Sequence, residues 1–162
     1  MEKLHEGQKA AIYKELALKD ILTGLYSRNA YDEWERDNQH PDKTAIVMLD
    51  LNNLKKCNDR YGHEAGDTYL KKASEMITNA FSQENTVYRI GGDEFVVWIQ
   101  NSVSNLDSIL QVFDATIHDW HGKYSNSISV SYGVVKSSEK SFDSVQEISK
   151  LADERMYQNK KD

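Results

Sequence analysis

The sequence has little of several residue types and segments that would otherwise decide its class. Its 162 residues include a single cysteine, Cys57, so no disulfide can form within the chain, which fits a reducing compartment. No apolar run is longer than that of Ala45 to Leu49, which is far shorter than the roughly 20 residues that span a bilayer. The first residues, MEKLHEGQKAAIYKE, contain no apolar segment of the kind found in signal peptides. We therefore expect a cytoplasmic chain, and a membrane-anchored parent protein would carry its anchor before Met1.

Positive charge is also scarce. The chain has 20 Lys and Arg residues against 26 Asp and Glu, which gives a net charge of −6. Nucleic-acid coats and electrostatic membrane anchors need a basic surplus or patch, and no long basic run is present. We expect no nucleic-acid partner and no membrane contact by this chain. A phosphorylated small ligand is still compatible, because a bound metal ion can reverse the local field.

The rest of the composition is typical of one folded domain. Hydrophobic residues make up 39% of the chain and charged residues 28%, a mixture that supports a packed core. Hydrophobic periodicity predicts helices over 1–19, 28–39, 66–81, 106–120 and from Val145 onward, strands over 44–51 and 127–132, and a hairpin over 87–99. The apolar stripe of residues 1–19 is thin, which favours a stalk or partner-facing helix.

The order of these elements predicts the fold class. Without the two leading helices the order is β-α-β-β-α-β, the pattern of ferredoxin-like folds. We therefore predict an α+β fold with a ferredoxin-like βαββαβ core, helices packed on the sheet and an N-terminal stalk helix. The continuous apolar run of 44–51 predicts a strand buried on both faces. The helices are nevertheless expected on one face, with the other face or its rim open to a ligand or partner.

Acidic residues and glycines form the first candidate site. Asp50 ends the apolar strand, and Gly91-Gly92-Asp93-Glu94 forms the tip of the hairpin. Diglycine permits positive φ and close approach of a ligand, whereas adjacent carboxylates repel one another unless a cation lies between them. Asp50 could instead simply hydrogen-bond the next turn, and a plain hairpin also uses Gly-Gly. Because the βαββαβ order can make the two segments neighbours, the three acids are predicted to converge on one or two Mg²⁺ ions.

Polar residues between these segments suggest a nucleotide site. Lys55 or Lys56 could reach a phosphate. Asp67 could accept hydrogen bonds from the N1–H and 2-amino group of guanine, with the Asn58 amide on its other edge. The alternative is that Asp67 is only a helix N-cap and Asn58 a turn residue. His63 has no second His or Cys at metal-ligand spacing, which favours a structural or ligand-adjacent role over zinc binding.

Several stretches together resemble the GGDEF family of diguanylate cyclases. They are DILTGLYSR (20–28), DLNNLKKCND (50–59), YGHEAGD (61–67), RIGGDEF (89–95), SYG (131–133) and ADERMY (152–157). The resemblance covers residues 20–162, which divides the chain into a linker or stalk helix over 1–19 and a catalytic domain over 20–162.

The resemblance implies a reaction and its metal site. Two GTP molecules, one on each of two facing domains, would condense into cyclic di-GMP with release of pyrophosphate. Asp50, Asp93 and the Leu51 carbonyl would bind Mg²⁺, or alternatively Mn²⁺, and Glu94 would be a further acidic contributor. Asp93 is also the position to which the family assigns proton acceptance.

The resemblance also implies substrate contacts and partners. Asn58 and Asp67 would bind guanine, His63 would lie beside the nucleoside, and Lys55 and Lys160 would contact phosphates. Gly91 and Gly92 would let the substrate approach the tip. Turnover would need a homodimer, and an upstream regulatory domain would act through the helix over 1–19.

The sequence departs from the family pattern at three places, one of which is Asn52, where family members often have a second Asp. Ser82–Asn85 stands where many cyclases have an inhibitory Arg-x-x-Asp, so no inhibitory product site is expected. A phosphate-contacting Arg usually follows a few residues after the equivalent of Lys160, whereas this chain ends at Asp162, which predicts a truncated C-terminal end. The leading hypothesis is an active diguanylate cyclase. The alternative is a weak or inactive GGDEF domain that serves as a GTP-binding or dimerisation module.

Overall fold

The computed structural model describes residues 3–81, 85–100, 103–122 and 127–160. Its helices and strands follow in the order α1 (Glu6–Ala17), α2 (Arg28–Asp37), β1 (Ala45–Leu51), α3 (Leu54–Tyr61), α4 (His63–Ala80), β2 (Thr86–Arg89), β3 (Glu94–Ile99), a 3₁₀ turn (Val103–Asn105), α5 (Leu106–Asp119), β4 (Val130–Lys136) and α6 (Val145–Gln158). None of the described helices is both long and apolar enough to cross a membrane.

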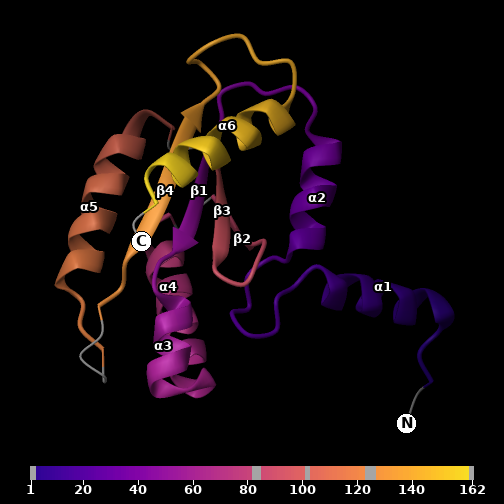
Figure 1. Cartoon of the computed structure of the whole chain (residues 1–162). Helices are drawn as coiled ribbons and strands as arrows, with labels where there is room; N and C mark the ends of the chain where they lie inside the picture. The colour runs from indigo at the N-terminus through magenta and orange to yellow at the C-terminus, as the bar shows by residue number, and fades with distance from the viewer. Residues whose placement is uncertain (1–2, 82–84, 101–102, 123–126, 161–162) are drawn as a thin grey trace.

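The four strands form one antiparallel sheet in the order β2-β3-β1-β4 (Figure 1). β1 lies between β3 and β4 and is buried along its whole length, as its apolar sequence predicts. This strand order and the βαββαβ sequence of elements confirm the predicted α+β fold with a ferredoxin-like core. The register pairs Ala45 with Ile99 at one end of β1 and Asp50 with Glu94 at the other.

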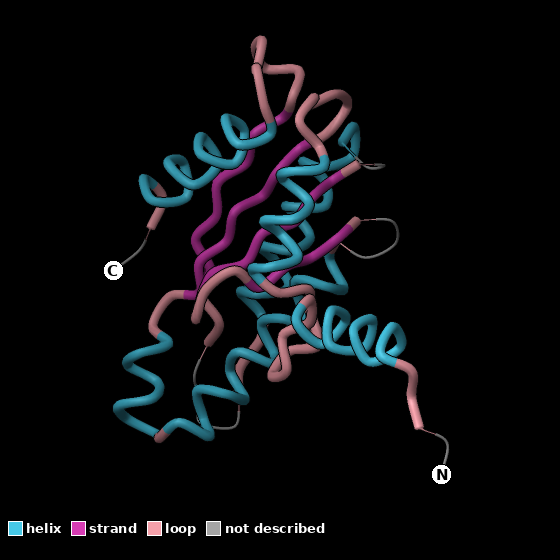
Figure 2. The backbone as a smooth tube through the Cα atoms, turned by 90° about the vertical axis from the view of Figure 1, so that its right-hand side faces the viewer, coloured by secondary structure: helices cyan, strands magenta, loops and turns pink. Residues whose placement is uncertain are grey.

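Helices cover both faces of the sheet, so the prediction that they pack on one face is wrong. Alternate residues of β1 point to opposite sides. Ala45, Val47 and Leu49 belong to a core shared with α4 and α5. Ile46 and Met48 belong to a second core shared with α2 and α6, the helices outside the βαββαβ unit. Figure 2 shows the sheet between these two helical layers.

Two predicted elements differ from the structure. The segment after β1 contains an additional short helix, α3, which the periodicity did not reveal because Cys57 is its one buried residue. The strand predicted over 127–132 is displaced to β4, which continues through Gly133. A Cβ at Gly133 would lie 2.2 Å from the Ala152 carbonyl oxygen. A glycine inside this strand is therefore a requirement of close packing against α6 rather than the end of the strand.

The predicted starts of the helices at residue 28 and at Val145 agree with the structure, whereas α4 begins at His63, three residues before the predicted start. Gly24 adopts a φ of 74° in the turn between α1 and α2, and the Ser27 hydroxyl accepts a hydrogen bond from the Ala30 amide. Ser144 caps α6 in the same way by accepting from the Glu147 amide. The predicted N-terminal helix is present as α1, none of its residues is buried, and it projects from the rest of the molecule (Figure 1).

Candidate metal and nucleotide site

Three carboxylates meet at one edge of the sheet. Asp50 lies near the end of β1, Asp93 in the β2–β3 turn, and Glu94 at the start of β3. Antiparallel pairing places Asp50 directly opposite Glu94, and the Leu51 amide donates a 2.8 Å hydrogen bond to the Asp93 carbonyl oxygen. One carboxylate oxygen from each of the three acids lies within 4.8 Å of the others. The convergence predicted from the order of elements is therefore present.

Asp50 is the most deeply buried member of this acidic cluster. The residue is 3% exposed, and its Oδ2 atom pairs with the Lys160 ammonium, which follows α6, at 2.8 Å. That contact raises the pKa of Lys160 through a hydrogen bond and through opposite charge. The other oxygen, Oδ1, is buried and has no hydrogen-bond partner within the described part of the chain. A buried carboxylate oxygen without a partner is costly unless a ligand satisfies it.

The two acids at the tip are electrostatically unfavourable in their ionised form. Burial raises the pKa of Asp93, and the neighbouring Asp50 carboxylate raises it further. Burial also raises the pKa of Glu94, with additional repulsion from Asp50, Asp93 and Asp153, which the Arg28 guanidinium only partly offsets. The protein thus holds several negative charges together without enough positive charge among the described residues to balance them.

The chemistry of this cluster fits a hard divalent cation. Mg²⁺ and Mn²⁺ prefer carboxylate and carbonyl oxygens, and all three converging groups supply carboxylate oxygens. The unpartnered Asp50 Oδ1 could accept such a contact. Beside the cluster is an open pocket of about 590 Å³, lined by Asp50, Glu94, Asp153, Glu154, Met156, Tyr157, Gln158 and Lys160. The pocket gives a ligand larger than a metal ion access to Asp50 and Glu94.

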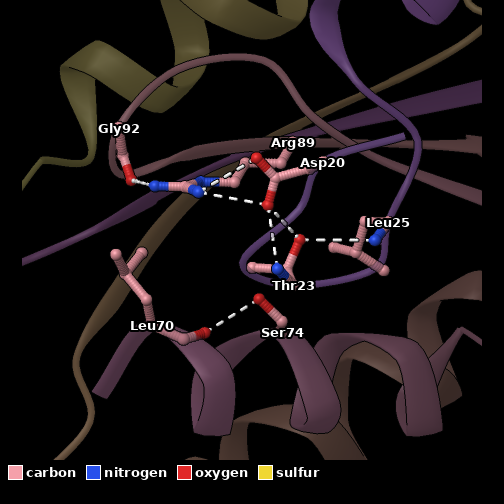
Figure 3. A network of polar contacts seen from close by, with 7 residues as sticks. All are labelled: Asp20, Thr23, Leu25, Leu70, Ser74, Arg89 and Gly92. Atoms are coloured by element: carbon pink, nitrogen blue, oxygen red, sulfur yellow. Dashed lines mark hydrogen bonds and ion pairs between the residues drawn. The ribbon is translucent and has the colours of Figure 1, made fainter. Parts of the chain in front are cut away.

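A second charged cluster supports the tip from behind. The Arg89 guanidinium donates 3.1 Å hydrogen bonds to both carboxylate oxygens of Asp20 and a 2.8 Å bond to the Gly92 carbonyl oxygen (Figure 3). The amide and hydroxyl of Thr23 also donate to Asp20, at 2.9 and 2.6 Å. We call Asp20, Thr23, Arg89 and Gly92 the brace. It ties the turn before α2 to the glycine that precedes Asp93.

The carboxylate in the brace is fully satisfied. Burial raises the pKa of Asp20, but hydrogen bonds from Thr23 and the nearby Arg89 outweigh burial and hold this pKa below its usual value. Neither Asp20 nor Arg89 was predicted to have a role, although both stand in the stretches that carry the family resemblance. Asp-x-x-Thr is a local turn pattern and could have predicted the Thr23 contacts. Nothing local indicates the pairing with Arg89, which is far along the chain.

One of the two roles predicted for the diglycine, the use of positive φ, is wrong. Positive φ among the described glycines occurs at Gly24 and Gly62, so neither Gly91 nor Gly92 uses the left-handed conformation. A Cβ on Gly91 would lie 3.1 Å from Oε2 of Glu94, which would crowd that carboxylate. Gly92 is exposed, and its carbonyl accepts the bond from Arg89. Gly91 thus leaves room for Glu94, and Gly92 connects the tip to the brace.

The predicted guanine contacts lie on α3 and α4. Asn58 is half-buried against Gly66, where an added Cβ would lie 1.6 Å from the Asn58 Oδ1 atom. Gly66 precedes Asp67, so the structure brings the Asn58 side chain to the turn of α4 that carries Asp67. Asp67 is exposed and follows four residues of α4, which rules out the alternative that it is an N-cap. Asn58 lies within α3 and is not a turn residue.

The structure says less about the roles of the remaining predicted site residues. Lys55 is exposed on α3, and His63 is exposed as the first residue of α4. Of Ser82–Asn85, residues 82–84 lie outside the described part of the chain, while the Asn85 side chain accepts a hydrogen bond from the Gln100 amide. The absence of an inhibitory product site therefore stays a prediction. The charges of Asp153 and Arg28 also act on Glu94, and neither residue was predicted because only the fold places them there.

Comparison with known proteins relates this arrangement to a family. The profile described as "Diguanylate cyclase, GGDEF domain" matches residues 17–162. The diguanylate cyclase DgcS of Shewanella oneidensis is 30% identical over 156 residues, which cover 91% of this chain and 52% of that protein. The cyclic di-GMP phosphodiesterase PdeR of Escherichia coli is 41% identical over 90 residues, or 54% of this chain and 14% of that protein. The chain thus spans about half the length, or less, of these relatives.

A solved structure confirms the fold. The crystal structure of the coiled coil and GGDEF domain of DgcB from Caulobacter crescentus, in complex with c-di-GMP, superposes with a TM-score of 0.74. The match covers 93% of this chain and 84% of that one at 22% sequence identity. Since the family profile matches nearly the whole chain, and the acidic tip, the strand order and the solved fold agree with it, this chain belongs to the GGDEF diguanylate cyclase family.

Proposed function

We propose that this chain is a diguanylate cyclase that converts two GTP molecules into cyclic di-GMP and two pyrophosphates. The observation that carries the proposal is the buried, partnerless Oδ1 of Asp50 within a cluster of three converging carboxylates. Repulsion among these carboxylates costs stability, so the cluster is better explained by a function than by a structural role. Membership of the GGDEF family supplies the reaction that such a cluster would serve.

In the proposed reaction, the 3′-hydroxyl of each GTP attacks the α-phosphorus of the other. Each attack forms one phosphodiester bond and displaces one pyrophosphate, and the hydroxyl proton passes to a base. Asp50, Asp93 and Glu94 would hold Mg²⁺ or Mn²⁺, with the Leu51 carbonyl as a further ligand. The bound cation would neutralise charge on the phosphates during nucleotidyl transfer. Asp93, whose pKa is raised, is the proposed proton acceptor.

Residues outside the acidic cluster would position the nucleotide. Asn58 and Asp67 would bind the guanine edge, a pairing supported by the packing of Asn58 against Gly66. His63 would lie beside the nucleoside, and Lys55 and Lys160 would contact phosphates. Gly91 and Gly92 would allow close approach to the tip. Substitution of Asp67 by Ala should weaken GTP binding by about tenfold while leaving the thermal midpoint unchanged, because Asp67 is exposed.

One domain holds only half of the proposed reaction, so turnover would require two copies to face each other. Helix α1, all of whose described residues are unburied, is the proposed linker through which an upstream regulatory domain controls that pairing. We accordingly assign residues 1–19 to the linker and 20–162 to the catalytic domain. High protein concentration should favour activity, because pairing follows mass action.

The experiment that tests the proposal is incubation of concentrated protein with GTP and Mg²⁺, with the products identified by mass spectrometry. Asp93→Asn is the matched control, since it keeps the shape of the side chain and removes its charge. Cyclic di-GMP from the parent protein alone would support both the reaction and the site. Full activity in Asp93→Asn would contradict the assignment of the tip.

The competing function is a GTP-binding or dimerisation module without turnover. The similarity to PdeR favours considering it, because a protein named as a phosphodiesterase contains a segment like this chain. This alternative predicts GTP binding in calorimetry together with no product at any protein concentration. The unaltered Gly91-Gly92-Asp93-Glu94 sequence favours the cyclase instead.

A further inference from the structure

We infer that Lys160 acts as a placeholder cation, which pairs with Asp50 when no metal is bound and is displaced from that carboxylate when a divalent cation enters. The inference rests on the proposed metal site and assigns Lys160 a second role in addition to the proposed phosphate contact. It concerns the order of events at the site, because one ammonium group cannot make a full ion pair with Asp50 and with a nucleotide phosphate at the same time.

The contact itself is specific. The Lys160 ammonium lies 2.8 Å from Oδ2 of Asp50, whose side chain is only 4% exposed. Lys160 stands two residues after the end of α6, and its side chain is 40% exposed, so it reaches the buried carboxylate from the solvent side. A lysine so exposed could remain fully hydrated, yet it is directed toward the acidic cluster. It lines the same open pocket as Asp50 and Glu94.

The contact leaves the cluster only partly satisfied. Lys160 engages one oxygen of Asp50, and Oδ1 still has no partner among the described residues. One ammonium also faces three converging carboxylates. A divalent cation carries twice the charge of an ammonium and can accept oxygens from several carboxylates at once, which a lysine cannot do with the same geometry. Lys160 therefore offsets part of the negative charge of the cluster but does not satisfy all of its oxygens.

Entry of the cation should weaken the Lys160 contact. A divalent ion bound to Asp50 places two positive centres on one carboxylate, and they repel each other. The exposed, flexible lysine is the one that can move, because α6 itself is packed through Ala152 and Met156. Displacement would return the ammonium to the pocket. When a nucleoside triphosphate binds together with its cation, the Lys160 ammonium would then be available to contact a phosphate.

Two metal-binding measurements without nucleotide test this inference. Mn²⁺ binding is followed by the electron paramagnetic resonance signal of the free ion, for the parent protein and for Lys160→Met, Lys160→Gln and Asp50→Asn. Lys150→Met is the matched control, since Lys150 is an exposed lysine on α6. In parallel, the Cε signal of Lys160 is followed by NMR in protein labelled with ¹³C-lysine during a Mg²⁺ titration, with Lys160→Met providing the assignment.

We expect Lys160→Met and Lys160→Gln to bind Mn²⁺ roughly two- to fivefold more tightly than the parent, the range that a half-exposed ion pair allows. Lys150→Met should match the parent, Asp50→Asn should bind weakly, and the Lys160 Cε signal should shift in step with Mg²⁺ saturation. Unchanged or weaker Mn²⁺ binding in both Lys160 variants, with a parent that still binds, would overturn the placeholder role alone. Absence of Mn²⁺ binding by the parent and both Lys160 variants would overturn the placeholder role and the proposed metal site together.

Discussion

The brace and the acidic cluster lie on opposite sides of the same hairpin tip and treat their carboxylates in opposite ways. Asp20, 23% exposed, receives hydrogen bonds from Thr23 and Arg89, and its pKa is lowered. Asp50 is more deeply buried, pairs with a single lysine and keeps one oxygen without a partner, while its neighbour Asp93 has a raised pKa. Burial alone therefore does not decide the direction of the pKa shift, because burial acts to raise the pKa of both Asp20 and Asp93, yet only that of Asp93 is raised overall.

The brace and the acidic cluster differ in how many hydrogen-bonding and positively charged partners the described residues supply to each carboxylate. Where the described protein groups saturate a carboxylate, its charge holds the fold together, as it does between Asp20 and Arg89. Where they leave like charges facing each other, as at Asp50 and Glu94, the fold stores repulsion that a cation can relieve. The brace ties down the turn that carries the two acids of the tip.

The largest expected effect is on activity. Asp93→Asn should lower cyclase activity at least about 100-fold, because the effect of losing a metal ligand should exceed the 10–100-fold typical of the groups that orient ligands. Asp20→Asn should reduce activity far less at temperatures where the variant stays folded. Initial rates of product formation at matched protein concentration provide the measurement. Equal losses in the two variants would remove the distinction between cluster and brace.

The next effect is on stability and affects the brace. Asp20→Asn should lower the free energy of unfolding by about 1.5–3 kcal/mol, the range for a hydrogen bond to a charged group. The bond from Arg89 to Gly92 would lose its anchor at the same time. Denaturant unfolding measures the change, and Glu75→Gln serves as control because its pair with Lys72 is exposed. A brace variant as stable as this control would show that Asp20 does not hold the tip.

A smaller effect of opposite sign is expected in the acidic cluster. Glu94→Gln should raise the free energy of unfolding of the metal-free protein by about 0.2–1 kcal/mol, since it removes a like charge directly opposite Asp50. The same denaturant titration in the presence of a chelator measures the gain. A loss of stability would mean that Glu94 makes a favourable contact that the metal-free structure needs.

The two regions should also respond oppositely to pH. The pKa of Glu94 is raised in the fold, so its penalty is absent while it is protonated and grows as the pH rises above its ordinary value of 4.5. The pKa of Asp20 is lowered, so its contribution is present above the ordinary value of 3.8 and is lost as the pH falls through the lower folded value. Denaturant unfolding of the parent, Asp20→Asn and Glu94→Gln between pH 3 and 7 measures how far each variant differs from the parent in its free energy of unfolding. At pH 7 the two differences should have opposite signs, and both should shrink as the pH falls. Two differences of the same sign would contradict the assignment.

The sequence predicts the acidic cluster better than the brace. Asp50 ends a strand, and Asp93 and Glu94 form a hairpin tip, so the order of strands is enough to bring them together. Asp20 and Arg89 have no such pattern, and their contact depends on where the turn before α2 meets β2. The partnerless oxygen of Asp50 is a three-dimensional property as well, since it depends on every group that packs around it.

The errors in the fold prediction also concern features that depend on tertiary packing. β1 is buried on both sides, which requires helices on both faces of the sheet. The prediction considered only the helices within the βαββαβ unit, and these cover one face. Helices α2 and α6 lie outside that unit and provide the second layer. Helix α3 escaped detection because it buries only Cys57, and β4 was misplaced because Gly133 serves packing against α6.

The most direct test of the central claim is the effect of Mg²⁺ on thermal unfolding of the parent, Asp20→Asn and Asp93→Asn, without nucleotide. If the acidic cluster is a cation site, saturating Mg²⁺ should raise the midpoints of the parent and of Asp20→Asn by similar amounts, because binding to the folded state stabilises it. Asp93→Asn should gain much less from Mg²⁺. An equal rise in all three proteins would contradict the claim that the unsatisfied carboxylates are where the cation binds.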